Sequence, residues 1–276
     1  MIYVPLAPEG VLAEALDAMF YIQGYAPEHN IERLTPDGKL AVVIELDGQE
    51  RFVHDNASLK PKQSCKNAWL SGMHTGFISI SALDNTTLLA IQFKPGKAYP
   101  FIKQPLDSFK DKVVPAVTVF GDTILALRKQ LLSLPDPQQK LDTTASWLMN
   151  QYDVNLLPNE QVEAVLNQII TTPTLPTVKH ALEQHSYSKK HFLHLFKKHV
   201  GLSPKALQRI LRFSEVLQLI QAEEQVQWAQ ISVECGYYDQ SHFIKDFVHF
   251  SGYNPKEFLD EDHDRPNFFP VDEPDM

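Results

Sequence analysis

The sequence predicts an α+β protein of two domains, with a β-barrel or β-sandwich and a helical hairpin first and an all-helical domain after them. Two observations carry this prediction. Short β-branched runs bounded by turn residues fill residues 1–120, and a helical segment at residues 187–205 recurs at residues 238–256. A chain of 276 residues is long enough for two domains, and 43% hydrophobic residues supply ordinary cores.

The first half of the chain is dominated by strand signals. Residues 40–46 form an apolar, β-branched run after the turn signal Pro36-Asp37-Gly38. Further short strands are expected at 50–54, 75–81 and 86–93, each bounded by Asp, Asn or Gly. Many short strands at close spacing favour a sandwich or a barrel.

Helical periodicity begins after this region. Residues 122–134 and 137–152 each place apolar side chains on one face and are separated by Pro135. They predict a helical hairpin beside the barrel. Further on, Ser203 is expected to cap a long helix that runs to about residue 220 and spaces the two copies of the repeat.

Each copy of the repeat has the signals of a short helix with both ends marked. Ser188 and Asp239 can accept hydrogen bonds from amides of the first turn, whereas Gly201 and Gly252 suit a left-handed stop. Other helical runs precede the two copies, at 178–185 and 228–235. A helix, a tight turn and a second helix with a polar outer face make up the helix-turn-helix plan.

The signature strings of this region are Gly201-Leu202-Ser203-Pro204-Lys205, Arg209-Ile210-Leu211-Arg212-Phe213, Gly236-Tyr237-Tyr238-Asp239-Gln240-Ser241-His242-Phe243 and Gly252-Tyr253-Asn254-Pro255. With this spacing, residues 160–260 resemble the two-module DNA-binding domain of AraC-type transcription regulators. The resemblance implies sequence-specific binding to double-stranded DNA. A purely structural helical bundle would explain the phenylalanines but not the doubled module.

The outer faces of the two repeated helices supply the candidate DNA contacts. They are Lys189, Lys190, His194 and Lys197 in the first module and Gln240, Ser241, His242 and Lys245 in the second. The first module departs more from the family pattern, with Leu182 and Ser186 in place of a small Ala and a Gly, and His194 in place of an Arg. The second has Ser232 in place of a small Ala. We therefore expect the second module to contribute more to base reading.

The N-terminal half resembles the cupin-like sensor domain of one AraC-type subgroup, in its Pro36-Asp37-Gly38 turn and its Phe93-Lys94-Pro95-Gly96 turn. This resemblance implies control by a small-molecule effector or by dimerisation, and the mouth of a barrel is a common ligand site. It also implies that the helical hairpin is the contact between the two subunits of a homodimer. Periodicity alone predicts equally well that the hairpin packs on its own barrel.

No enzymatic signature accompanies the barrel. Metal-dependent cupins place two His one residue apart, whereas His29, His54 and His74 stand alone and residues 1–120 contain no His-x-His. His191 and His194 are three apart on a helix but have no third ligand at matching spacing. No metal, cofactor or catalytic residue is predicted, and the protein is expected not to be an enzyme. The alternative is a ligand-binding or enzymatic cupin-like protein with a degenerate helical domain.

The predicted divisions are a cupin-like sensor and dimerisation domain at 1–152, a linker at 153–159, the DNA-binding domain at 160–260 and an acidic tail at 261–276. We expect the tail to be loosely packed, with Phe268-Phe269-Pro270 able to dock on the body. The net charge of −9 is compatible with DNA binding, because residues 179–215 carry eight Lys or Arg against two Glu.

Location follows from what the sequence lacks. No apolar run approaches the length of a membrane span, and the N-terminus shows no basic-then-apolar signal. Cys65 and Cys235 are too few and too far apart for a disulfide framework or a zinc site. A reduced, cytoplasmic setting without a membrane partner is expected.

Overall fold

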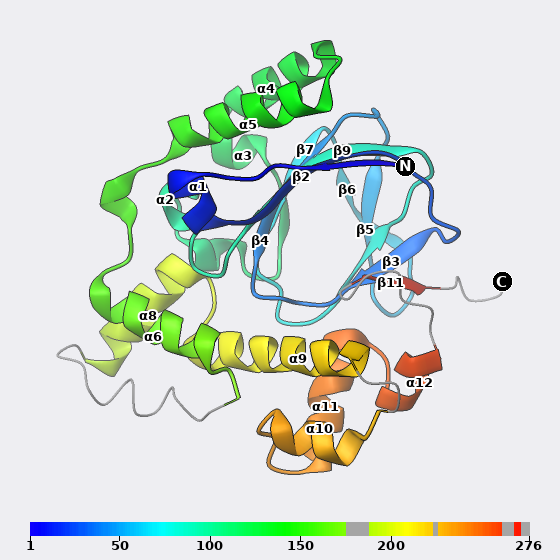
Figure 1. Ribbon diagram of the computed structural model, residues 1–276, viewed down its shortest axis with the longest axis vertical. Coiled ribbons are helices and arrows are strands. Elements are labelled where there is room, and N and C mark those ends of the chain that lie inside the picture. The colour runs from blue at the N-terminus through cyan, green and yellow to red at the C-terminus, as the bar shows by residue number, and fades with distance from the viewer. Residues whose placement is uncertain (175–187, 223–225, 261–267, 272–276) are drawn as a thin grey trace.

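The computed structural model describes residues 1–174, 188–222, 226–260 and 268–271, and within them two antiparallel sheets are followed by a helical region (Figure 1). The larger sheet has the strand order β1 (Ile2–Pro5), β2 (Leu16–Tyr25), β9 (Thr86–Phe93), β4 (Leu40–Glu45), β7 (Ala68–Ser71), β10 (Val113–Pro115). The smaller sheet has the order β11 (Phe268–Val271), β3 (Ile31–Leu34), β8 (Ile78–Ser81), β5 (Arg51–His54), β6 (Pro61–Cys65). The predicted combination of a β-sandwich or barrel with a helical C-terminal domain is confirmed.

Strand β4 explains why its sequence is a continuous apolar run. It lies inside the larger sheet, paired with β9 on one side and β7 on the other. Val42 and Ile44 join the large core cluster on one face, whereas Val43 joins a small cluster on the opposite face. Because successive side chains of a strand point to opposite faces, a strand buried on both sides needs apolar residues throughout.

Several strands lie where no strand was expected. The expected strands at 50–54 and 75–81 are shorter, at Arg51–His54 and Ile78–Ser81, whereas β9 agrees with the prediction. Strand β3 (Ile-Glu-Arg-Leu) lacks an alternating pattern, and β6 (Pro-Lys-Gln-Ser-Cys) is largely polar and forms an edge of its sheet. Such strands form because of pairing with distant segments, which local propensity does not report.

The helices of the N-terminal half are α1 (Gly10–Ala15), α2 (Tyr99–Ile102), α3 (Val117–Phe120), α4 (Thr123–Ser133) and α5 (Pro137–Gln151), with 3₁₀ turns at Leu106–Phe109 and Val154–Leu156. Helices α4 and α5 form the predicted hairpin, and Asp136 caps α5 by accepting hydrogen bonds from the amides of Gln138 and Gln139. The hairpin packs on its own barrel through buried leucines such as Leu127 and Leu148.

The helices of the C-terminal half are α6 (Glu160–Thr171), α8 (Lys189–Val200), α9 (Pro204–Ala222), α10 (Trp228–Glu234), α11 (Gln240–Ser251) and α12 (Pro255–Asp260). Asn159 caps α6, its Oδ1 accepting from the amide of Val162 at 2.9 Å. Ser203 likewise caps the long helix α9 as expected, at 3.2 Å from the amide of Ala206. The expected helix at 178–185 lies outside the described residues. None of the described helices is long and apolar enough to cross a membrane.

Part of the acidic tail docks, as its apolar triplet suggested. Strand β11 pairs antiparallel with β3, with Phe269 opposite Arg33 and Val271 opposite Ile31. Phe269 is buried, and its ring centroid lies 4.8 Å from that of Phe258 in α12. The hydroxyl of Tyr253 donates to the carbonyl oxygen of Pro270 at 3.0 Å. The tail strand therefore joins the β-domain to the end of the helical region.

The two halves share one cluster of buried apolar side chains, which includes residues of the larger sheet, of the α4–α5 hairpin and of helices α6, α8, α9 and α11. In Figure 1 the hairpin lies above the larger sheet and those other helices lie below it. The turn at Gly96 lies at this junction with φ +74°, and a Cβ there would approach Leu166 Cδ2 to 2.4 Å. Only glycine meets both demands at low cost. Further along the junction, Nε2 of His249 lies 2.7 Å from the carbonyl oxygen of Thr75.

Candidate functional site

Helix α8 presents one apolar and one basic face. Oγ of Ser188 accepts from the amide of His191 at 3.3 Å, and Gly201 ends the helix with φ +86°. Phe192 and Phe196 are buried against the core. The predicted contact residues Lys189, Lys190, His194 and Lys197 are all exposed. At 3.6 residues per turn, Lys190, His194 and Lys197 lie on the side away from those phenylalanines, whereas Lys189 is the first residue of the helix. These four side chains give the exposed surface of α8 cationic groups and hydrogen-bond donors.

Helix α11 repeats this plan. Asp239 caps it, its Oδ1 accepting from the amide of His242 at 2.7 Å, and Gly252 ends it with φ +79°. The predicted contacts Gln240, Ser241 and Lys245 are exposed. His242 differs from them, because it is only half-exposed and is held within the domain. Its Nε2 lies 3.7 Å from Asp246, and its ring meets that of Tyr237 edge-on at 5.3 Å.

An ion pair fixes α11 against the long helix α9. Nη2 of Arg209 donates to Oδ1 of the buried Asp246 at 2.6 Å, and Nε donates to Oδ2 at 3.3 Å. The bond to Asp246 raises the pKa of Arg209, so the guanidinium stays charged. Such a two-point bond defines orientation as well as proximity. Local sequence patterns do not reveal this bond, because Arg209 and Asp246 lie on different helices.

A cleft of about 430 Å³ opens where α9 and α11 meet. Its lining is mainly cationic and polar: Lys205, Gln208, Arg209, Arg212, His242, Lys245 and Asp246. Lys205 and Lys245 are exposed at this cleft, whereas Arg209 is bound to Asp246. A concave surface with free lysines attracts phosphate by local charge, whatever the net charge of the chain.

The core of the second module is aromatic. The ring of Trp228 in α10 lies 5.9 Å from that of Phe243 and 5.7 Å from that of Phe247. Ser232, at the family's small-residue position, is buried, and its hydroxyl donates to the carbonyl oxygen of Ala229 at 2.9 Å. This serine is therefore accommodated without an orphaned polar atom. The departures Leu182 and Ser186 of the first module lie outside the described residues.

A second candidate site is a cavity of about 640 Å³ between the inner faces of the two sheets. Its apolar lining includes Phe20, Ile22, Val43, Trp69, Ile80 and Leu88. Its polar side chains include Glu32, Asp37, Lys39, Arg51, His74 and Gln92. This volume falls in the range of small-molecule pockets, and an apolar wall with a few polar groups is their usual lining. The barrel interior is therefore hollow rather than filled by side chains.

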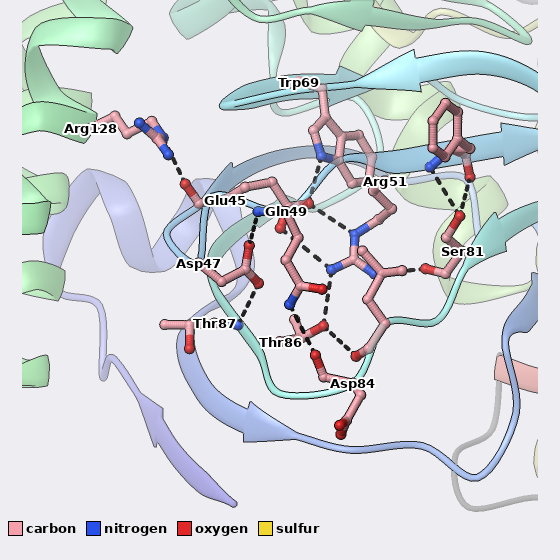
Figure 2. Close-up of polar contacts among 12 residues, drawn as sticks. Glu45, Asp47, Gln49, Arg51, Trp69, Ser81, Asp84, Thr86, Thr87 and Arg128 are labelled. Carbon is pink, nitrogen blue, oxygen red and sulfur yellow. Dashed lines mark hydrogen bonds and ion pairs between the residues drawn. The ribbon is translucent and has the colours of Figure 1, made fainter.

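A buried polar cluster forms one wall of this cavity (Figure 2). Nε of Arg51 donates to Oε1 of Glu45 at 2.9 Å, and Nε1 of Trp69 donates to the same oxygen at 3.0 Å. On the far side, Arg128 reaches from α4 and donates to the backbone oxygen of Glu45 at 2.7 Å. Glu45 therefore links the cavity wall to the hairpin. The sequence analysis gave Glu45 no role, although a carboxylate within an otherwise apolar run is a signal that could have drawn notice to it.

The isolated histidines of the β-domain are hydrogen-bonded within it. His29 lies 3.1 Å from Glu32, and His54 lies 2.8 Å from the carbonyl oxygen of Leu59. His74 lies 2.9 Å from Oγ of Ser71. Within the described residues, no group of three or more His, Cys, Asp or Glu side chains is placed to hold a metal ion. Cys65 and Cys235 are free and buried, and burial raises the pKa of each thiol to about 11.

His74, which lines this cavity, makes the stability of the folded chain depend on pH. Burial lowers the pKa of His74 from 6.5 to about 4, against a smaller opposing effect of Asp111. Between these values the unfolded chain binds a proton that the folded chain does not, so stability falls as the pH falls from 6.5 to 4. The loss from this group is at most about 3 kcal/mol. We expect His74→Gln to reduce the loss of unfolding free energy between pH 6.5 and pH 4, as measured by denaturant titrations at a series of pH values. If the variant loses as much stability as the natural chain over this range, His74 is not the group responsible.

Solved structures of one protein are similar to this chain at low sequence identity. Solved structures of ToxT from Vibrio cholerae are similar to it: the P21 form has 12% identity and a TM-score of 0.44, covering 87% of this chain and 97% of that one. The form with bound unsaturated fatty acid has 13% identity and a TM-score of 0.42, covering 89% and 96%. No curated protein matches the sequence.

Two families match parts of the chain. Residues 5–115 match a domain of unknown function (DUF6597), and residues 182–261 match a helix-turn-helix domain. The second range contains α8 to α12, with the two capped helices and the strings that resemble AraC-type regulators. The C-terminal part of the chain is therefore a helix-turn-helix domain whose signature strings resemble those of AraC-type regulators, and it follows an N-terminal β-domain that matches a family of unknown function.

Proposed function

We propose that the protein is a cytoplasmic, sequence-specific DNA-binding transcription regulator, controlled by a small molecule bound in the β-domain, and that it is not an enzyme. The observation that carries this proposal is the pair of helices α8 and α11. Each has a side-chain cap, a left-handed glycine stop, a buried aromatic face and an exposed polar face. Helix α9, with 19 residues, is about 28 Å long at 1.5 Å per residue, which suits two helices reading successive turns of one duplex.

The proposed contacts divide between the modules. Lys189, Lys190, His194 and Lys197 would contact DNA from α8, and Gln240, Ser241 and Lys245 from α11. Gln240 suits an adenine edge, whereas the lysines suit phosphates. We assign His242 a supporting role, because its imidazole already lies against Asp246 and Tyr237.

Strand β3 offers a physical route from the cavity to the second module. Its inward residues Glu32 and Leu34 line the cavity. Between them, Arg33 points the other way, with its guanidinium carbon 4.7 Å from the ring centroid of Tyr253, next to the stop glycine of α11. A ligand that moves β3 would therefore act on α11 through Arg33. Control requires that the ligand bind two such arrangements with different affinities.

The test is a DNA-binding measurement. Fluorescence anisotropy against genomic fragments should detect a fragment that is bound in the presence of excess non-specific DNA. Lys189→Ala with Lys190→Ala should weaken that binding and lower its salt dependence, since phosphate contacts release counterions. Lys60→Ala, an exposed lysine of the β-domain, is the matched control and should change neither. Failure to retain any fragment at low salt would reject the proposal.

We further propose that the α4–α5 hairpin mediates a homodimer. Leu125 and Leu132 are one heptad apart on α4 and are 39% and 49% exposed, and Met149 of α5 is 39% exposed. Leu125→Glu with Leu132→Glu should convert a dimer into a monomer in light scattering while leaving the thermal midpoint of the monomer unchanged. Val154→Glu, at a residue 59% exposed outside the hairpin, should leave the dimer intact. A monomeric natural chain at micromolar concentration would contradict this assignment.

A further inference from the structure

The charged side chains that line the cavity are not equally available to a ligand. Arg51 is occupied by Glu45 on two nitrogens, and it also donates to the carbonyl oxygen of Ser81 at 2.7 Å. Lys39 is bonded to Asp17 at 2.8 Å and lies 3.4 Å from Asp37. Each lining cation is therefore already neutralised by a carboxylate, and neither is free to receive an anion.

Glu32 is the opposite case. It is 7% exposed, and Oε1 receives the hydroxyl of Tyr25 and faces Nε2 of His29 at 3.1 Å. A tyrosine hydroxyl is not a cation, and His29 carries a charge only when it is protonated. Among the described residues, no lysine or arginine forms an ion pair with this carboxylate. A buried carboxylate without a permanent cation is costly, so a positively charged ligand group beside it would be favoured.

The aromatic side chains of the cavity favour the same charge. Tyr3, Phe20, Tyr25 and Trp69 all line it, and the rings of Tyr3 and Phe20 are 5.5 Å apart. The face of an aromatic ring attracts a cation, and cages of aromatic rings bind quaternary ammonium groups. The remaining aliphatic wall suits an apolar body.

Building on the proposed control by a small molecule, we propose that the ligand is a small amphipathic amine, with an apolar body between the sheets and a protonated amino group at Glu32. The ammonium group would form a charge-assisted hydrogen bond with the carboxylate. The cavity volume of about 640 Å³ admits a body of one or two rings.

The direct test compares two probes of one shape and opposite charge. Tryptamine and indole-3-propionate carry the same indole on a two-carbon arm, one ending in an ammonium and the other in a carboxylate. By calorimetry and thermal shift on the full chain, tryptamine should bind and raise the midpoint, and indole-3-propionate should bind at least about tenfold more weakly. Equal binding, preference for the acid, or no binding of tryptamine at millimolar concentration would overturn the inference. This comparison needs no variant.

A variant then tests whether Glu32 is the anchor, meaning the residue that binds the amino group of the ligand. Glu32→Gln keeps the size of the side chain and an acceptor for Tyr25 but removes the charge, so it should weaken tryptamine binding about tenfold or more. Glu28→Gln makes the same change at an exposed residue before β3 and should leave binding unchanged. If both variants bind tryptamine equally well, Glu32 is not the anchor. Amine binding without any DNA binding would reject only the proposed function, whereas DNA binding without amine binding would reject only this inference.

Discussion

Phe269→Ala is expected to lower the free energy of unfolding by about 3–5 kcal/mol, one of the largest effects of any substitution in the chain. Phe269 is 1% exposed and packs on Phe258, although it belongs to a tail whose composition is acidic and polar. Truncation removes the apolar contacts and leaves a cavity that the docked strand cannot close. Chemical denaturation monitored by circular dichroism gives this quantity directly.

The control for this substitution is Leu259→Ala. Leu259 lies in α12 beside Phe258, but its side chain is 44% exposed, so the change should cost about 0.5 kcal/mol or less. If Phe269→Ala proves as mild as this control, strand β11 does not contribute to the folded state in solution.

The second large effect is expected on DNA affinity. Gln240→Ala with Lys245→Ala should weaken binding to the selected fragment more than Lys190→Ala with His194→Ala does. The second module has the more regular signature, and each lost base contact costs on the order of 1–3 kcal/mol. The four side chains are exposed, so the folded state should tolerate each pair of changes. Competition with mismatched DNA distinguishes a loss of base-specific affinity from a loss of non-specific affinity. If the α8 pair of changes weakens binding more than the α11 pair does, the first module contributes more to affinity than the second.

Features set by neighbouring residues could be predicted from the sequence, whereas features set by contacts between distant segments could not. The ends of α8 and α11 were predicted to the residue, because Ser188, Asp239, Gly201 and Gly252 act within one helical turn. The exposed and buried faces of both helices followed from the same periodicity. Whether the exposed residues contact DNA remains a prediction.

A ligand site in the β-domain was expected, but the residues that line the cavity, Glu32 among them, could not be predicted. Glu32 and Arg51 come from different strands of one sheet, and Trp69 comes from the facing sheet. Their meeting depends on strand register and on how the sheets face each other, which a single sequence does not encode locally. The apolar triplet at residue 268 marked a docking segment, but nothing in it identified β3 as its partner.

The pairing of β11 with β3 also has a consequence for biosynthesis. Ile31 emerges early from the ribosome, whereas its partner Val271 emerges after the whole helical region has been translated. N-terminal segments begin to fold during synthesis, so the smaller sheet forms with the edge of β3 unpaired. Unpaired strand edges recruit other chains. Chaperone binding to nascent chains should therefore persist until residue 271 is available, and messages truncated before it should yield aggregated protein.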